Sequence, residues 1–237
     1  MLNRLGAALV AEAVGTFLFF FVGAGSVVVA TSSADGGPGL VGIAFAHGIA
    51  LAVAVSALGA VSGAHFNPAV TVAVRLAGRI EWSHAVAYVV VQLAAAVAAG
   101  LALRWVLPES AWSASFIGTP ALGEGIGPVA GVAIEAILTL LLVVAVFGTA
   151  VDPRAPRLGG MAIGLAVAAD VMMGGPLTGA AMNPARWFGP AVASGHLNDW
   201  YVWWVGPLIG AIVGAVIYRY ALESRAEPTV TPATPEG

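Results

Sequence analysis

Two stretches of this chain resemble each other, SGAHFNPAV at residues 62–70 and TGAAMNPAR at residues 178–186. In both, a Gly-Ala pair is followed after two residues by Asn-Pro-Ala. Asn is a favoured helix N-cap and Pro is favoured at the first helical position, so each copy is predicted to begin a short helix, near residues 67–77 and 183–193. A single such motif is usually an ordinary helix cap, whereas two copies in the same setting predict a shared role.

The regions that hold these motifs are too long for single membrane spans. Residues 36–74 contain no charged side chain, and a helix of that length would extend roughly 58 Å, about twice the thickness of the hydrocarbon core. The run is interrupted by Gly59, Gly63 and Pro68. We therefore expect one full span and one segment that enters the membrane without crossing it, and residues 175–198 repeat this pattern. Non-helical backbone at that depth is tolerated only inside protein or against a water-filled cavity, which indicates a pore or a transport site.

The composition excludes most other classes of protein. Of 237 residues, 59% are apolar, only 9 are basic and 12 acidic, and the mean hydropathy is +0.94. This is too apolar for a disordered chain, a coiled coil or a water-soluble domain. A net charge of −3 without a basic stripe excludes nucleic acid as a partner. The lack of Cys, of paired His or acidic ligands and of a catalytic triad predicts no metal, no cofactor and no enzyme activity.

A polytopic helical membrane protein remains, with a single channel domain over residues 1–222 and a disordered cytoplasmic tail over residues 223–237. The first apolar run contains Glu12 and no small-residue cleavage site, so it is expected to stay as a span. The six predicted spans lie near residues 6–30, 39–59, 83–106, 128–150, 158–174 and 200–222.

The distribution of Arg predicts the orientation. With the N-terminus inside, seven of the nine basic residues face the cytoplasm, as the positive-inside rule requires: Arg4, Arg75, Arg79, Arg154, Arg157, Arg219 and Arg225. We therefore expect a multi-pass protein of the lipid bilayer of the cell membrane, with both termini cytoplasmic. The absence of Lys and the abundance of Ala and Gly favour a bacterial source.

The internal similarity extends beyond the two motifs. Residues 11–25 resemble residues 134–148, and each stretch has one Glu early in a span, Glu12 and Glu135. Each repeat, about 6–106 and 128–222, thus holds three spans and one re-entrant segment. Since three is odd, the second repeat has the opposite orientation, and such inverted repeats place the functional site at the midplane. The two carboxylates are expected to brace the re-entrant loops by accepting hydrogen bonds from their backbone.

The paired half-helices also predict the chemistry of that site. Their N-termini would meet near the membrane centre, where the positive ends of two helix dipoles and the amides of Asn67 and Asn183 repel cations and donate hydrogen bonds. A passing water would accept from both Asn side chains, which interrupts a proton-conducting chain of waters. The carbonyl acceptors predicted to line the path are those of Gly63, Ala64, His65, Gly179, Ala180 and Ala181.

These features together resemble the aquaporins of the major intrinsic protein family. The resemblance covers roughly residues 6–222 and rests on the doubled motif (Asn67, Pro68, Ala69 and Asn183, Pro184, Ala185), the pair Glu12 and Glu135, Gln92 and Arg186. It implies an all-α bundle of six transmembrane helices and two re-entrant half-helices in an inverted 3+3 repeat. It also implies a homotetramer with one pore per subunit, permeable to water. The second repeat is most similar to the plant tonoplast-type branch.

The resemblance further implies a selectivity filter made by four residues: His47, Val171, Ala180 and Arg186. Arg186 would exclude cations, His47 would donate or accept a hydrogen bond across the pore, and Val171 and Ala180 would form a small apolar wall. Strict water channels usually have Phe and His where this chain has His47 and Val171, so a wider pore that also passes ammonia is expected.

The glycerol-channel subgroup fits less well, because this chain has Trp187, Ala191 and Trp203-Trp204 at positions where that subgroup has other residues. Trp187 and Asp170 have no assigned role in the resemblance. The alternatives are a facilitator of small neutral solutes (glycerol, urea or hydrogen peroxide), an ion-coupled secondary transporter and an impermeable junction protein.

Overall fold

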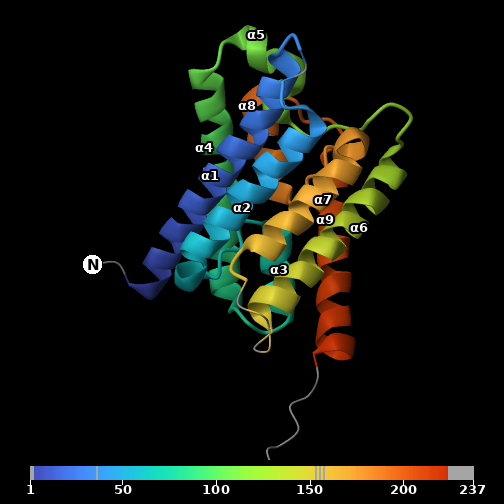
Figure 1. Cartoon of the computed structure of the whole chain (residues 1–237). Coiled ribbons are helices and arrows are strands. Elements are labelled where there is room, and N and C mark those ends of the chain that lie inside the picture. The colour runs from blue at the N-terminus through green and yellow to red at the C-terminus, as the bar shows by residue number, and fades with distance from the viewer. Residues whose placement is uncertain (1–2, 36, 153, 155, 157, 224–237) are drawn as a thin grey trace, which may run out of the picture.

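The computed structural model describes residues 3–35, 37–152, 154, 156 and 158–223, and within these residues the protein is entirely helical (Figure 1). Six helical segments are long and apolar enough to cross a membrane. They are α1 (Arg4–Ser32), α2 (Gly39–Ser62), α4 (Trp82–Val106), α6 (Pro128–Val146) continued by the π-helical turn η2 (Phe147–Val151), α7 (Met161–Thr178), and α9 (Val202–Ile217) continued by η3 (Tyr218–Leu222). The predicted all-α bundle with six spans is confirmed.

Two short helices enter the bundle from opposite ends, α3 (Pro68–Leu76) and α8 (Pro184–Ser194) (Figure 1). Each begins as its sequence predicts, because the Asn side chain caps the helix that the following Pro starts. Asn67 Oδ1 accepts from the amide of Ala69 at 2.8 Å, and Asn183 Oδ1 accepts from the amide of Ala185 at 2.9 Å. The inverted arrangement of the half-helices is confirmed.

The ends of two spans differ from the sequence prediction. Helix α2 continues past Gly59 to Ser62, and α7 begins at Met161 and continues through Pro176 to Thr178. Both helices end where a left-handed glycine follows, Gly63 (φ 86°) and Gly179 (φ 77°). Glycine adopts this conformation without a steric penalty, whereas the Pro within the last turn of α7 removes only one amide donor. The predicted boundaries at residues 59 and 174 were therefore wrong.

Small residues allow the long helices to approach closely. A side chain at Gly48 of α2 would lie 2.5 Å from the carbonyl oxygen of Gly164 in α7, so the two backbones are in direct contact there. Such contacts replace the hydrophobic effect as the source of helix association in lipid. Between the repeats, α5 (Glu109–Trp112) and the 3-10 turn η1 (Ser113–Gly118) cross one end of the bundle (Figure 1).

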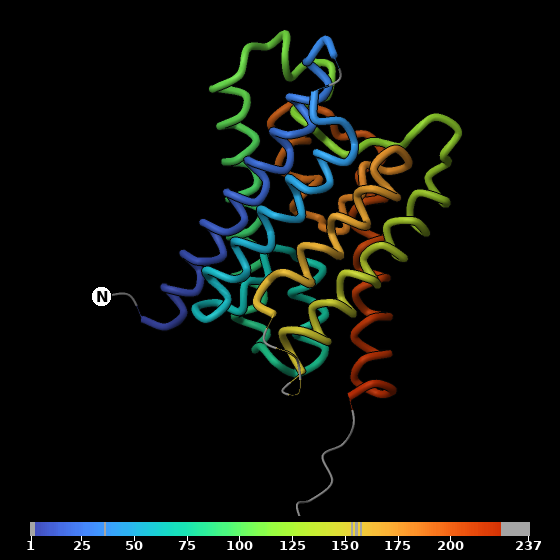
Figure 2. The backbone as a smooth tube through the Cα atoms, viewed as in Figure 1, coloured from blue at the N-terminus to red at the C-terminus, as the bar shows by residue number. Residues whose placement is uncertain are grey.

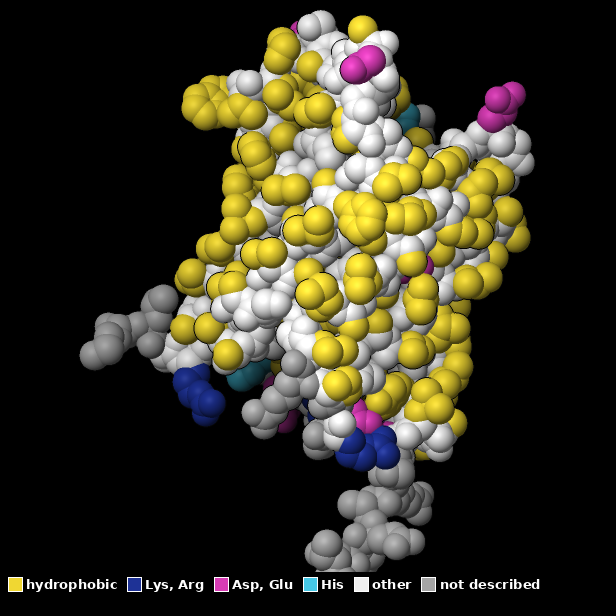
Figure 3. Space-filling model, in the orientation of Figure 1, with side chains coloured by type: hydrophobic (Ala, Val, Ile, Leu, Met, Phe, Trp, Pro, Cys, Tyr) yellow, Lys and Arg dark blue, Asp and Glu magenta, His cyan; other side chains and the backbone are white. Residues whose placement is uncertain are grey.

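The outer surface has the pattern of a membrane protein. Apolar side chains cover the middle of the visible face, and the basic side chains on it lie at the lower end (Figure 3). We call this the Arg-rich end; both ends of the described chain, Asn3 and Glu223, lie there (Figure 2). Of the Arg residues expected on this side, Arg157 and Arg225 lie outside the described residues, as does the predicted tail beyond Glu223.

Candidate functional site

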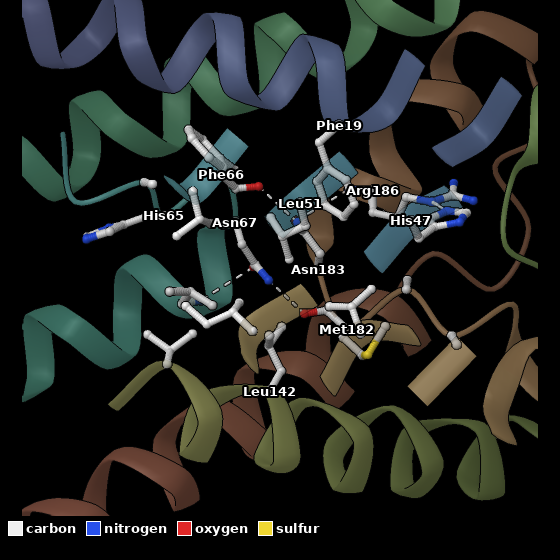
Figure 4. A pocket seen from close by; sticks show the side chains of 18 residues that line it. Phe19, His47, Leu51, His65, Phe66, Asn67, Leu142, Met182, Asn183 and Arg186 are labelled. Carbon is white, nitrogen blue, oxygen red and sulfur yellow. Dashed lines mark hydrogen bonds between the residues drawn. The ribbon is translucent and has the colours of Figure 1, made fainter. Parts of the chain in front are cut away.

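A narrow cavity lies between the two repeats, where the half-helices meet (Figure 4). At the Arg-rich end, it shares Ala64 and His65 with a wider recess. At the opposite end, it shares His47 and Arg186 with a second recess. The three spaces follow one another from end to end of the bundle and define a path through it, which we call the channel.

The two Asn side chains cross at the centre of this channel (Figure 4). Asn67 Nδ2 donates to the carbonyl of Met182, and Asn183 Nδ2 donates to the carbonyl of Phe66, both at 2.9 Å. Each Asn therefore bonds to the residue just before its counterpart. Because an amide nitrogen carries two hydrogens, one N–H of each Asn is left for a molecule in the channel.

Glu12 of α1 holds the loop that precedes Asn67. Its carboxylate accepts from the amides of His65 and Phe66 at 2.9 and 2.8 Å, and from Ser62 Oγ at 2.7 Å. A fourth bond comes from Gln92 Nε2 at 2.8 Å. This fully buried carboxylate thus replaces water as the partner of the loop backbone.

Glu135 of α6 repeats the arrangement in the second half. It accepts from the amides of Ala181 and Met182 at 2.9 and 2.6 Å, and from Thr178 Oγ1 at 2.7 Å. The expected contacts between the two carboxylates and the re-entrant loops are therefore present in both repeats. Since these loop amides point away from the channel, their peptide carbonyls are free to face it.

The loops that carry these carbonyls adopt an unusual backbone conformation. Ala64 and Phe66 in the first repeat, and Ala180 and Met182 in the second, have φ values between 45° and 52°. A left-handed conformation at such residues costs roughly 1–3 kcal/mol each and persists only where the surroundings enforce it. The buried hydrogen bonds to the two carboxylates supply that enforcement. Of the other expected carbonyl residues, Gly63 lines the recess at the Arg-rich end and Gly179 lines the opposite one.

Arg186 lies where the channel meets the recess opposite the Arg-rich end. Its Nε donates to His47 Nε2 at 3.1 Å, and its Nη1 donates to the carbonyl of Gly118 at 2.9 Å. A guanidinium has five donors, so donors on Nη1 and Nη2 remain for the channel. Val171 lines the recess opposite the Arg-rich end, as His47 and Arg186 do, and Ala180 lines the central cavity. Of the four predicted filter residues, His47 and Arg186 line both spaces, whereas Val171 lines only the recess and Ala180 lines only the central cavity.

The sequence of the whole described bundle matches one protein family. The family model described as "Major intrinsic protein" matches residues 3–218. The chain belongs to the major intrinsic protein family.

Similar proteins agree with this membership. Aquaporin TIP4-4 of Zea mays is 44% identical over 218 residues, which cover 89% of this chain and 84% of that protein. Aquaporin TIP2-1 of Arabidopsis thaliana is 42% identical over 89% of this chain and 85% of its own length. The expected similarity to the tonoplast-type branch is confirmed. In fold, the X-ray structure of the aquaglyceroporin from Plasmodium falciparum is similar, with a TM-score of 0.77, 20% identity, and coverage of 92% of this chain and 96% of that one.

One expectation about this family member's filter needs correction. His47 was expected to donate or accept a hydrogen bond across the pore. Its Nδ1 instead lies 2.9 Å from the carbonyl of Ile43, which only accepts, so Nδ1 carries the hydrogen and Nε2 accepts from Arg186. Both nitrogens are thus used within the protein. His47 therefore orients Arg186, and the Cδ2–Nε2 edge of its ring packs against Gly23 of α1.

Other residues of the site were missed in the sequence. Gly118 bonds Arg186 from a loop whose preceding residues, Phe116 and Ile117, have positive φ. A tether also holds the end of α2 and of α7: Tyr88 donates to the carbonyl of Ser62 at 2.8 Å, and Trp203 donates to that of Thr178 at 2.9 Å. Tyr88 and Trp203 lie at equivalent positions in the two repeats, so the internal repeat pairs them. The two residue types differ, however, and the sequence similarity alone did not reveal the shared role.

Trp187 occupies the place in α8 that Thr71 has in α3, four residues after the Asn. The Thr71 hydroxyl lies 3.1 Å from Gln92 Nε2 and 3.2 Å from His65 Nδ1. Trp187 instead stacks on Trp203, with ring centroids 5.6 Å apart. Hydrogen bonds therefore hold the first half-helix, and aromatic packing holds the second.

Asp170, beside Val171, does not face the channel. It is 1% exposed, lines neither the cavity nor its recesses, and its Oδ2 has no hydrogen-bond partner among the described residues. It packs inside the bundle on α7. Nothing in the structure explains the choice of an acid there.

Proposed function

We propose that this chain is a passive water channel that excludes protons and ions and also passes small neutral solutes such as ammonia. The observation that carries the proposal is the crossed pair Asn67 and Asn183 at the centre of a path through the bundle. Relatives named as aquaporins, at 42–44% identity, support the same function. The family consists of channels, so no enzyme activity is proposed.

The centre of the path favours water and rejects cations. The N-termini of α3 and α8 point their positive dipole ends toward this region. A water there accepts from the free N–H of each Asn, so its own hydrogens point away from the centre in both directions. Neighbouring waters then cannot pass a proton through it, because the hydrogen-bonded chain reverses its direction at that molecule. Loop carbonyls are the acceptors on either side.

The filter region sets which neutral solutes pass. Arg186 adds a fixed positive charge, and its remaining donors bind a solute oxygen or nitrogen. The wall opposite consists of the short side chains Val171 and Ala180. Small apolar walls leave room beside water for ammonia, and they offer no second hydrogen-bonding group.

The surface of the bundle bears on the assembly and the orientation of the protein. We propose a homotetramer with one channel per subunit, because the outer faces of α2 and α7 are apolar and carry exposed Phe45, Ile49 and Leu165. The Arg-rich end is proposed to face the cytoplasm, with both termini there. The cell membrane is the proposed location. Light scattering of the detergent-purified protein measures its mass and tests the tetramer.

Stopped-flow light scattering on proteoliposomes tests the function. We expect fast osmotic water efflux and fast ammonia uptake with little glycerol uptake. Val167→Trp, which places a large ring in the cavity, should abolish both fluxes. Ile209→Trp, on the exposed face of α9 and outside the proposed subunit interface, is the control and should leave them unchanged.

The alternatives predict other results. Glycerol or urea uptake as fast as that of water would indicate a broad facilitator of neutral solutes. Flux that saturates and depends on an ion gradient would indicate an ion-coupled transporter and overturn the proposal. Vesicles no more permeable than empty ones would indicate a junction protein.

A further inference from the structure

A second concave site lies on the outside of the bundle, between α3 and α4. This groove shares no lining residue with the central cavity or its two recesses. Its walls include Val72 of α3 and Val86 and Val90 of α4, and one end is formed by Arg75 and Trp82. Val86 and Val90 are each more than half exposed, so the groove opens to the surroundings of the protein.

Arg75 is the charged residue that lines this apolar groove. Its guanidinium carbon lies 4.7 Å from the centre of the Trp82 ring, and its Nε is buried without a hydrogen-bond partner among the described residues. Among the described residues, Arg75 also has no ion-pair partner, whereas Arg79 pairs with Glu223. The terminal Nη atoms of Arg75, which are not buried like Nε, also have no acceptor among the described residues, so an external anion at these nitrogens would supply the partner that this guanidinium lacks.

The position along the membrane normal identifies the kind of anion. Asn67 lies at the centre of the channel, and eight helical residues further on, Arg75 lies about 12 Å away along α3. Half of the hydrocarbon core is about 15 Å thick, so this guanidinium reaches the level of the lipid phosphates. Trp82 begins α4 at the same level, where aromatic residues prefer the membrane interface.

A second cation lies nearby. Arg219 Nη1 donates to the carbonyl of Leu76, the residue that follows Arg75, at 2.7 Å. A guanidinium without an ion-pair partner favours a headgroup with a net negative charge over a zwitterionic one, which brings its own cation.

We propose that the groove between α3 and α4 binds an anionic phospholipid, with its phosphate on Arg75 and one acyl chain along Val72, Val86 and Val90. In this arrangement the acyl chain covers the apolar wall, and the phosphate pairs with the guanidinium. A second copy of the chain would cover the valines but would also have to bring an acid to Arg75.

Native mass spectrometry of the full chain in detergent tests the proposal, with phosphatidylglycerol or phosphatidylcholine titrated as the probe. Wild type is expected to bind phosphatidylglycerol about tenfold more tightly than phosphatidylcholine, the effect of one charge-assisted contact. Arg75→Gln should remove this preference, and Arg75→Lys should keep part of it. Arg4→Gln removes the same charge from an exposed site at the same end and should leave this preference unchanged.

A second variant tests the part of the groove that holds the acyl chain. Val86→Trp, which fills the groove from its exposed side, should weaken the binding of both lipids. Unchanged water flux in each variant shows that the channel is folded.

Two results would overturn the proposal. One is an equal affinity of wild type for the two lipids, or an equal loss in Arg75→Gln and Arg4→Gln, which would show that only the overall charge matters. The other is a smaller oligomer in Val86→Trp with an unchanged lipid preference, which would show that a second copy occupies the groove.

Discussion

Glu12 and Glu135 are ionisable side chains that are fully buried inside the bundle. An ionisable group inside a membrane protein is expensive unless it is fully partnered. Here each accepts two hydrogen bonds from the amides of one re-entrant loop and a third from the hydroxyl group that ends the preceding span. The cost is offset because the same bonds hold a strained loop whose carbonyls line the channel.

Replacement of Glu135 by Gln tests this role. The amide nitrogen would face a backbone N–H, so at least one bond to Ala181 or Met182 is lost and the variant should be destabilised by roughly 2–4 kcal/mol. We expect a lower thermal unfolding temperature and slower water flux. Glu81→Gln is the control, because Glu81 precedes α4 without a side-chain capping bond. A variant as stable as this control would contradict the bracing role.

Val171 is the residue at which solute choice should be adjustable. Its side chain lies beside His47 and Arg186, so Val171→His should narrow the channel at the charged filter. We expect ammonia uptake to fall several-fold while water flux changes little. Val171→Ile, which adds one carbon without polarity, is the control. Uptake that falls equally in both variants would assign the effect to size alone, and unchanged uptake would place Val171 outside the filter.

At the scale of the elements, the two repeats use different side chains to hold their re-entrant loops. The loops before α3 and α8 must be held from behind, and each is tethered through the last carbonyl of the preceding span. The first repeat uses the hydroxyl of Tyr88 and the second uses the indole of Trp203. The second repeat also lacks the polar contacts of Thr71 and relies on the stacked pair Trp187 and Trp203.

A matched pair of substitutions separates hydrogen bonding from packing. Tyr88→Phe keeps the ring and removes the bond to Ser62, whereas Trp203→Phe removes the bond to Thr178 and weakens the stack on Trp187. We expect losses of about 1 kcal/mol for Tyr88→Phe and about 2–3 kcal/mol for Trp203→Phe. Thermal unfolding measures both. Equal losses would show that the stack contributes little. Only Trp203→Phe should alter solute selectivity, because Thr178 leads directly to Ala180.

At the scale of the whole molecule, polar contacts link distant parts of the chain across the Arg-rich end. Asp152 accepts from Tyr218 at 2.9 Å and from Arg154 Nε at 2.9 Å, which connects the end of α6 to the end of α9. Arg79 pairs with Glu223, which connects the loop after α3 to the end of the described chain. The two inverted repeats are thus joined outside the channel as well as within it.

The stability of this junction should depend on pH in one direction. The hydrogen bonds from Arg154 hold the pKa of Asp152 well below its usual value. A group with a lowered pKa stabilises the fold above its unfolded pKa, about 3.9 for Asp, and this contribution is lost as the pH falls through the lower folded value. The gap in unfolding temperature between wild type and Asp152→Asn should therefore be constant near neutral pH and shrink below about pH 4. Asp35→Asn, at the opposite end, is the control. A gap that instead widens on acidification would contradict the assignment.

Much of this molecule follows from its sequence, for local reasons. Hydropathy gives the number of spans because each must match the thickness of the bilayer. Asn67-Pro68 and Asn183-Pro184 specify where the half-helices begin, because capping involves only neighbouring residues. The visible repeat then implies the inverted pairing and the two bracing carboxylates.

The tertiary structure decided the rest, since those features depend on residues far apart in the chain. The ends of α2 and α7 at Gly63 and Gly179 depend on how the loops dock, and the predicted ends near residues 59 and 174 were too early. The hydrogen-bonding state of His47 depends on Arg186, 139 residues away, and Arg186 itself depends on a carbonyl at Gly118 in a loop without a sequence signal. Such contacts form only when the chain is packed, because the partner and its direction are set by the fold and not by the neighbouring residues.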